Sequence, residues 1–245
     1  MTRHTLWSDL AARLVAALKP IAAPIGIAFV REGVARDAPP FEASYPAANE
    51  SGRTGAVPAG CVFWMKAVDH TFSTSATDHA NCSVGSYTHG FLTLDEAAPR
   101  DDVVAALESG WVDKVAVASL PHLFERPGQV VYGPLAKFNT DPDVVLVRIN
   151  ALALMILKDA FPSLRIEGKP QCHIIAIAKE SGEIAASVGC ALSRARTGMR
   201  SDELTCAIPA SRLADIVPAI EAAGNLDRAM ASYAGADAKR FDANS

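Results

Sequence analysis

The chain has 245 residues, of which 50% are hydrophobic and 20% charged, and its formal net charge is −4. This length allows a substantial hydrophobic core, and the apolar content excludes an intrinsically disordered chain. The weak negative charge disfavours sequence-independent binding to nucleic acid or to an anionic membrane surface. We therefore expect a folded protein that has neither a nucleic-acid nor a membrane partner.

The distribution of apolar residues indicates a cytoplasmic protein. Residues 1–10 lack the uninterrupted apolar core of a signal peptide. The most apolar stretches, residues 20–30 and 143–160, are interrupted by Pro, Gly, Arg, Asn or Lys. Neither stretch supplies the roughly 20 continuous apolar residues that a membrane-spanning helix needs.

The first part of the chain predicts a helix, a strand and a long loop. Leucines recur every four residues from Leu6 to Leu18, which predicts an amphipathic helix over residues 1–20. The apolar run at residues 25–30 is typical of a buried strand. Residues 31–59 are rich in proline and lack periodicity, so we expect a long loop that covers a site.

Short elements follow this loop. Residues 60–69 carry bulky apolar side chains in a pattern that predicts a short helix, and residues 71–75 have strand character. Residues 78–90 contain glycines and histidines and are expected to form turns. Acidic residues favour the first turn of a helix, so Asp101 predicts a helix over residues 101–109.

The second half of the chain predicts strands mixed with helices. Residues 129–135 and 143–149 are apolar, as in strands, and Asn150 is a suitable N-cap for a helix that runs to Phe161. Because strands and helices do not alternate strictly, we expect an α+β fold in which helices pack on a mixed sheet, in a single domain over residues 1–245. The remaining expected elements are strands at residues 172–178, 183–188 and 203–208, a helix from Ser211, and a frayed tail over residues 234–245.

Several common functional motifs do not occur in the sequence. Residues 55–60 have the glycine spacing of a phosphate-binding loop, but Cys61 and Val62 stand where that loop needs Lys and Ser or Thr. There is no dinucleotide-binding glycine fingerprint, no nucleophile elbow and no Cys-x-x-Cys pair. Nucleotide binding, serine hydrolysis and a zinc ribbon are therefore disfavoured.

Cysteine gives the strongest functional signal. An odd number of cysteines, five, in a reducing compartment disfavours a disulfide framework, and core packing is the plain alternative. Cys61 is expected at the start of a helix, which stabilises a thiolate. Cys82 and Cys190 lie beside glycines that let backbone amides approach a sulfur or an anion. The glycines predicted to contact a cofactor are Gly85 and Gly189.

Two stretches resemble the signatures of a known family. Residues 60–68, Gly-Cys-Val-Phe-Trp-Met-Lys-Ala-Val, together with residues 81–85, Asn-Cys-Ser-Val-Gly, resemble the first signature of the uncharacterised ArCR family (domain of unknown function 169). Residues 187–190, Ser-Val-Gly-Cys, resemble the second signature. The resemblance implies no activity. It implies a family pattern that omits Cys206 and includes Cys61, Cys82, Cys172 and Cys190.

Thiolates from distant parts of a chain suit a soft metal or an iron–sulfur cluster. Four cysteines fill the ligand positions of a [4Fe–4S] cluster, whereas Cys61, Cys82 and Cys190 alone leave one iron open to a substrate. Structural zinc is less favoured because closely spaced cysteine pairs are missing. We therefore expect a site that binds an iron–sulfur cluster or another soft metal and acts on or senses a small molecule. Its expected ligands are Cys61, Cys82, Cys172 and Cys190.

Two other hypotheses remain open from the sequence. The first is a metal-free thiol enzyme in which Cys82 is the nucleophile and His79, or alternatively His89, is its base. The second is a non-catalytic protein that captures a small anion or cofactor through Arg194, since a guanidinium suits carboxylate and phosphate groups. A salt bridge to Asp202 or Glu203 is the structural alternative for Arg194.

Overall fold

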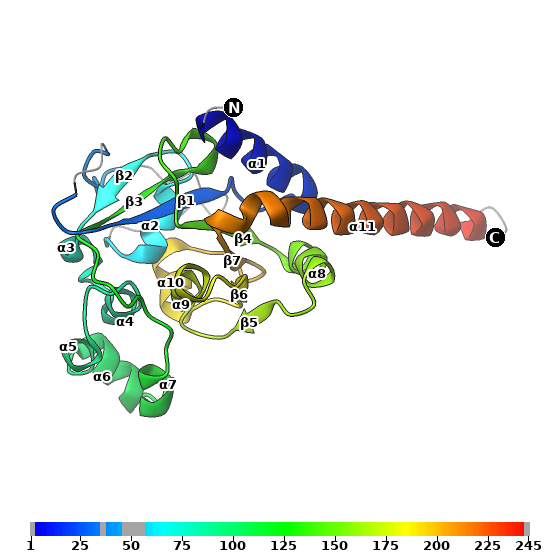
Figure 1. Cartoon of the computed structure of the whole chain (residues 1–245). Helices are drawn as coiled ribbons and strands as arrows, with labels where there is room; N and C mark the ends of the chain where they lie inside the picture. Colours follow the sequence, from blue (N-terminus) through cyan, green and yellow to red (C-terminus); the bar gives the residue numbers. More distant parts are fainter. Residues whose placement is uncertain (1–2, 35–37, 46–56, 243–245) are drawn as a thin grey trace.

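In the computed structural model, which describes residues 3–34, 38–45 and 57–242, the chain is built on a seven-stranded sheet (Figure 1). The strand order is β2-β3-β1-β4-β7-β6-β5, and every neighbouring pair is antiparallel except β5 and β6. This mixed sheet confirms the expected α+β fold. The strands are β1 (Ile25–Val30), β2 (Phe72–Thr74), β3 (Gln129–Pro134), β4 (Val144–Ile149), β5 (Arg165–Glu167), β6 (Ala185–Ser187) and β7 (Leu204–Pro209).

One face of the sheet is covered by three helices whose apolar stripes were visible in the sequence. Leu10, Leu14 and Leu18 of the first helix are almost completely buried against the sheet. The side chain of Asn150 caps the helix that begins at Ala151 by accepting a hydrogen bond from the Ala153 N–H (3.0 Å). The helices on this face are α1 (Arg3–Leu18), α8 (Ala151–Ala160) and α11 (Leu213–Asp242).

The opposite face carries an aromatic core and the cysteine-bearing helices. Phe63, Trp64, Phe72 and Tyr132 are buried there together with apolar side chains of the central strands. Their packing fixes the helix that begins at Gly60 against the sheet. The helices on this side are α2 (Gly60–Lys66), α9 (His173–Ala176), which a π-helical turn η2 (Ile177–Ser181) continues, and α10 (Ala191–Thr197).

A group of short helices lies beside this second face, and three of them stand away from the sheet (Figure 1). Side-chain N-caps stabilise the first turns of two of these helices. Thr93 accepts a hydrogen bond from the Glu96 N–H (3.3 Å), and Asp113 accepts one from the Ala116 N–H (2.7 Å). The helices are α3 (Ala76–His79), α4 (Ser83–Thr88), α5 (Leu94–Ala97), α6 (Asp101–Glu108) and α7 (Lys114–Ala118). Two 3₁₀ turns, η1 (Leu135–Lys137) and η3 (Ala210–Arg212), complete the described elements.

The expected strand at residues 172–178 is wrong, because this segment forms α9 and the start of η2. A short continuous apolar run is compatible with either a buried strand or a buried helix, and periodicity does not separate the two. The expected turn region at residues 78–90 also contains helix, since α4 and the end of α3 lie within it. Of the expected loop at residues 31–59, residues 35–37 and 46–56 lie outside the described residues.

The last helix extends well beyond the sheet (Figure 1). α11 contains 30 residues, and its first part packs on the body through buried residues up to Ala223. The expected frayed tail at residues 234–245 is therefore wrong as far as Asp242, while residues 243–245 lie outside the described part of the chain. Among the described helices, none combines the length and the apolar character that crossing a membrane requires.

Candidate functional site

Four of the five cysteines line one pocket with a volume of about 60 Å³. Cys61 lies in the first turn of α2, and the other three thiols belong to the residues that immediately precede short helices. The fold therefore brings together thiols from four separate segments. The residues that precede α4, α9 and α10 are Cys82, Cys172 and Cys190.

Two of these sulfurs lie against the start of α10. Burial raises the pKa of the Cys61 thiol to about 11, and neighbouring thiols add to this effect, while the nearby Ser193 hydroxyl opposes it. This hydroxyl donates its proton to Sδ of Met199 (3.3 Å). Burial also raises the pKa of Cys190, against hydrogen bonds from the backbone N–H groups of Ser193 and Leu192. Each of these donors stabilises the thiolate form of the sulfur that it contacts.

Different elements supply the polar groups beside the other two sulfurs. Burial raises the pKa of Cys172, and the nearby Cys82 raises it further, whereas the neighbouring Thr88 hydroxyl acts in the opposite direction. This hydroxyl donates its proton to the Gly85 carbonyl (3.0 Å). The Arg196 guanidinium lies beside Cys82 and donates a hydrogen bond to the carbonyl oxygen of Asn81 (2.9 Å). Burial, the largest single effect, acts to lower the pKa of Arg196, but Cys82, Cys61 and Asp102 together raise it above its usual value.

Cys206 provides an internal comparison for these four thiols. It lies in β7, is completely buried on the other face of the sheet, and packs in the core formed with α1, α8 and α11. Burial alone raises its pKa, to about 12, with no opposing hydrogen bond. The pocket thiols thus differ from a core cysteine in the polar groups that lie beside them.

The pocket does not form a ready-made site for a single metal ion. Within the described residues, no three His, Cys, Asp or Glu side chains are placed to hold a metal ion. The four pocket sulfurs are nevertheless close enough to raise one another's pKa values, as Cys82, Cys190 and Cys61 do for Cys172. Their arrangement is therefore that of a group of neighbouring thiols around a shared space.

His79 does not face Cys82 in the way that a thiolate–imidazolium pair requires. Its Nε2 donates to the Thr74 hydroxyl (3.1 Å), because that hydroxyl in turn donates to the Val130 carbonyl (3.1 Å). Its Nδ1 has no hydrogen-bond partner among the described residues. Burial, and then the neighbouring His89, hold the pKa of His79 well below its usual value. The expected pair is therefore not formed in this structure.

The two predicted glycines make room for functional side chains. A Cβ atom at Gly85 would lie 3.3 Å from the Cys82 sulfur, so this position leaves the thiol space within its own turn. Gly189 has φ +111°, a backbone conformation that L-residues rarely adopt, and a Cβ there would lie 2.8 Å from Nη2 of Arg194. Both glycines thus shape the loops that carry Cys82 and Cys190.

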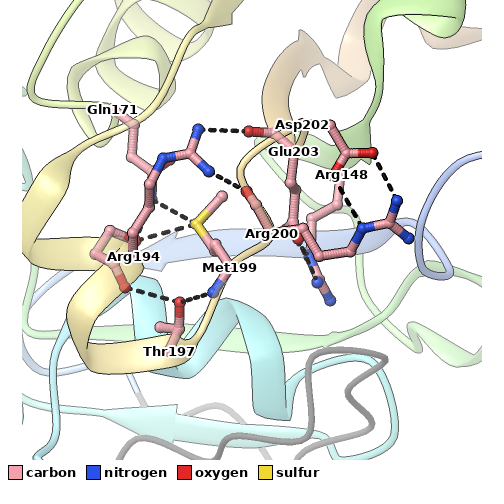
Figure 2. A network of polar contacts seen from close by, with 9 residues as sticks. Arg148, Gln171, Arg194, Thr197, Met199, Arg200, Asp202 and Glu203 are labelled. Atoms are coloured by element: carbon pink, nitrogen blue, oxygen red, sulfur yellow. Dashed lines mark hydrogen bonds and ion pairs between the residues drawn. The ribbon is translucent and has the colours of Figure 1, made fainter.

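Arg194 holds backbone in place and is not among the residues that line the pocket. Figure 2 shows its guanidinium within a network of polar contacts. It donates to the carbonyl oxygens of Val188 (3.0 Å), Glu203 (2.8 Å) and Arg200. The guanidinium thereby ties the segment before Cys190 to the start of β7.

The acidic residues near Arg194 have other partners. The Asp202 carboxylate pairs with Arg200 (2.6 Å), and the buried Glu203 carboxylate pairs with Arg148 (2.5 Å), as Figure 2 shows. The salt bridge considered for Arg194 therefore does not form with either carboxylate. Arg196, two residues further along α10, is the arginine that lines the pocket.

The sequence did not reveal the roof of the pocket. Val103 of α6, Val117 of α7 and Trp111 between these helices line it, and Lys169 lies over the Trp111 ring at 4.5 Å from the ring centroid. Gln171 also lines the pocket and is almost completely buried. The apolar spacing of residues 101–117 was the available signal for a covering element, but nothing in it indicated what that element covers.

The fold and this pocket define an α+β protein with a group of free thiols at the surface between α2, α4, α9 and α10. The family model described as uncharacterised ArCR, domain of unknown function 169, matches residues 13–219, and the chain therefore belongs to that family. This match confirms the resemblance seen in the sequence. Neither the curated proteins nor the solved structures contain a match to the chain.

Proposed function

We propose that the pocket binds an iron–sulfur cluster through Cys61, Cys82, Cys172 and Cys190, and that the protein acts on or senses a small molecule there. The observation that carries the proposal is that four free thiols, from four separate segments of the chain, line one pocket. A thiol that only fills the core needs no such neighbours, and Cys206 lies in the core on the other face of the sheet. Cysteine thiolates are the usual ligands of an iron–sulfur cluster.

The number and kind of side chains at the pocket suit a cluster. A [4Fe–4S] cluster takes one cysteine at each of its irons, and four thiols share this pocket. All four are uncombined cysteines, which is the form that binds iron.

The surrounding residues have definable roles around such a centre. A bound cluster with a cysteine on every iron would supply electron transfer. The Arg196 guanidinium lies beside Cys82, and Val103, Val117 and Trp111 form an apolar wall of the pocket. Arg194 holds the loop that precedes Cys190.

A metal-free thiol enzyme is the second candidate, and one contact favours it. The Arg196 guanidinium lies beside Cys82, and a neighbouring cation is typical of reactive cysteines. In this alternative Arg196 takes the activating role that the sequence suggested for His79. A non-catalytic binding protein is the third hypothesis from the sequence. Its affinity for its ligand would be unchanged when Cys82 is replaced.

Anaerobic purification followed by iron and acid-labile sulfide analysis tests the proposal. We expect about four irons and four sulfides per chain, with the broad visible absorbance of a cluster. Single Cys→Ala variants at the four pocket positions should each lower the iron content and change this spectrum. Cys206→Ala is the matched control, because it removes a buried thiol that lies outside the pocket.

Each outcome separates the candidates. A colourless protein that holds neither iron nor sulfide, before and after reconstitution with ferrous iron and sulfide, would overturn the proposal. Stoichiometric zinc without sulfide would replace the cluster with a single ion. Equal iron loss in Cys206→Ala and in the pocket variants would show that the effect reflects folding, and the assignment of the ligands would then fail.

A further inference from the structure

A second and larger hollow lies outside the cysteine-lined pocket. It has a volume of about 430 Å³ and lies between the end of α4, the start of α5 and residues 122–126, which lead towards β3. Volumes of roughly 300–1,000 Å³ are typical of sites for small molecules. We call it the aromatic groove, after the rings of Tyr87, Phe91, His122 and Phe124 that line it. It shares no lining residue with the cysteine pocket, so an inference from it does not depend on the proposed function.

The two walls of the aromatic groove are joined by backbone contacts. The Leu123 N–H donates a hydrogen bond to the Thr88 carbonyl (3.0 Å), which ties residues 122–126 to the end of α4. Gly90 has φ +74°, and a Cβ atom there would lie 3.0 Å from the Glu125 carbonyl oxygen, so this close approach requires glycine. The groove is therefore formed before any ligand binds, which lowers the entropic cost of binding.

The rings give the groove an apolar surface. Tyr87 and Phe91 are buried, and the His122 ring stacks on Tyr87 with 4.8 Å between the ring centroids. The Tyr87 hydroxyl lies 3.1 Å from Nδ1 of His122, so this ring is held in place. Phe124 stands edge-on to His122 at 6.1 Å and is 77% exposed. An exposed ring beside other rings offers a face that an aromatic group of a ligand can cover.

Arg126 supplies a cation without a partner. Its side chain is exposed and lines the groove, and it forms no hydrogen bond or salt bridge with any residue that the structure describes. Arg100, another cation close by, donates to the Glu96 carbonyl (3.4 Å) and does not line the groove. A guanidinium binds a carboxylate through two parallel hydrogen bonds. Arg126 therefore suits a carboxylate group of a ligand.

Glu96 supplies the opposite charge. Its Oε2 accepts hydrogen bonds from the Thr93 N–H (2.8 Å) and the Thr93 hydroxyl (3.1 Å), whereas its Oε1 has no hydrogen-bond partner among the described residues. The two bonds from Thr93, aided by the charges of Arg126 and Arg100, hold the pKa of Glu96 below its usual value. Glu96 and Arg126 thus line one groove and interact through their charges, but no salt bridge joins them in the described part of the chain. A group that carries both charges can fit between them.

We propose that the aromatic groove binds a free α-amino acid with an aromatic side chain. Its carboxylate pairs with Arg126, its ammonium group pairs with Glu96, and its ring packs on Phe124. The carboxylate and the ammonium group of an α-amino acid are attached to one carbon atom, so they can bridge two opposite charges that do not contact each other. Charges that leave water must be paired, and in this arrangement both charges of the ligand are.

Four probes separate the three parts of the ligand. L-Phenylalanine has all three, 3-phenylpropanoate lacks the ammonium group, 2-phenylethylammonium lacks the carboxylate, and L-alanine lacks the ring. Their binding to the anaerobically purified protein can be followed by NMR titration of the Leu92 and Leu123 methyl signals, because both residues line the groove. We expect L-phenylalanine to bind about tenfold more tightly than each of the other three, since each lacks one charge-assisted contact or the aromatic contact.

Variants assign each part of the ligand to its residue. Arg126→Gln should weaken the binding of L-phenylalanine about tenfold but not that of 2-phenylethylammonium, which has no carboxylate to lose a partner. Glu96→Gln should weaken L-phenylalanine but not 3-phenylpropanoate, and α5 keeps its capping box because Gln also serves there. Phe124→Ala should weaken the three phenyl probes by the same factor and leave L-alanine unchanged. Arg228→Gln is the matched control, since Arg228 is an exposed arginine of α11 outside the groove.

The proposal is overturned if no probe shifts the groove methyls, or if any of the three partial probes binds as tightly as L-phenylalanine. It is also overturned if Arg228→Gln weakens L-phenylalanine as much as Arg126→Gln does. Iron and sulfide are measured on the same samples. A cluster without a preference for L-phenylalanine removes this inference and leaves the proposed function. The preference without a cluster does the reverse.

Discussion

The protonation of single thiols links the pocket to the stability of the fold. Burial raises the pKa of Cys61 from 9.0 to about 11, although the residue keeps part of its surface open to the pocket. The unfolded chain, with the lower pKa, therefore loses this proton first as the pH rises. When the pKa of a group is higher in the folded state than in the unfolded chain, its contribution to the free energy of unfolding is complete at pH values below the unfolded pKa. This contribution is lost as the pH rises through the folded-state pKa.

We therefore predict that the metal-free, reduced protein loses stability between pH 9 and pH 11. The contribution of Cys61 to this loss is at most about 3 kcal/mol, because a pKa difference of one corresponds to about 1.4 kcal/mol. Urea unfolding followed across this pH range measures it. Cys61→Ala should show a shallower loss than the wild type, and equal slopes for the two proteins would contradict the assignment.

At the scale of single elements, the loop between β6 and α10 depends on one glycine and one arginine. Gly189 has φ +111°, and the Arg194 guanidinium occupies the space in front of it while it binds the Val188 carbonyl. The loop leads directly into Cys190. Its conformation therefore determines where this thiol lies.

Gly189→Ala should destabilise the protein by about 1–3 kcal/mol, because the new Cβ meets both an unfavourable backbone conformation and the guanidinium. Gly182→Ala is the control, since Gly182 also has positive φ (+65°) but no atom within 4 Å of the added Cβ. We expect Gly189→Ala to lower both the thermal midpoint and the iron content, and Gly182→Ala to lower only the midpoint. Equal effects of the two substitutions would argue against a role for Arg194 in placing Cys190.

The elements that the sequence predicted correctly have long or strongly patterned apolar runs. The leucine stripe of α1, the apolar strands β1, β3 and β4, and the Asn150 cap of α8 are local signals that the fold preserves. Short elements were harder, because a segment such as α9 is apolar on all sides and its packing decides its conformation. Helix α10 and strand β5 were missed for a different reason, because both are short and neither carries a periodic apolar signal of its own.

The site was predictable only in part. Glycine contexts and the family signature identified the four cysteines that line the pocket. They did not reveal the polar residues Thr88, Ser193 and Gln171 beside the thiols, since these neighbours depend on contacts between distant segments. His79 was misread because closeness in sequence does not fix the direction of a side chain: its ring packs against Phe63 and Phe91.

At the scale of the whole molecule, we expect the free energy of unfolding to come from the body of the protein and not from the part of α11 that projects from it. The family match covers residues 13–219 and thus ends within the docked part of α11. Gly224 still lies against the backbone of α1, where a Cβ would be 3.0 Å from the Ala17 carbonyl oxygen. Beyond it, the apolar residues Leu226, Met230 and Tyr233 are 71%, 65% and 60% exposed. The distal part of the helix therefore adds little burial to the fold.

A chain that ends at Gly224 should consequently fold like the full chain, with a thermal midpoint within about 2 °C, because surface residues away from the core change stability little. Circular dichroism should show the loss of helix alone, with iron content unchanged.

A chain that ends at Arg212 is the control. It removes the buried residues Leu213, Ile216, Val217 and Ile220, and each buried aliphatic side chain contributes about 1.5–3 kcal/mol. Such a loss approaches the roughly 5–15 kcal/mol that holds a domain folded, so this shorter chain should not fold. If the chain that ends at Gly224 were instead destabilised by many degrees, the exposed face of α11 would have to be covered in solution, and sedimentation of the full chain would then show an oligomer.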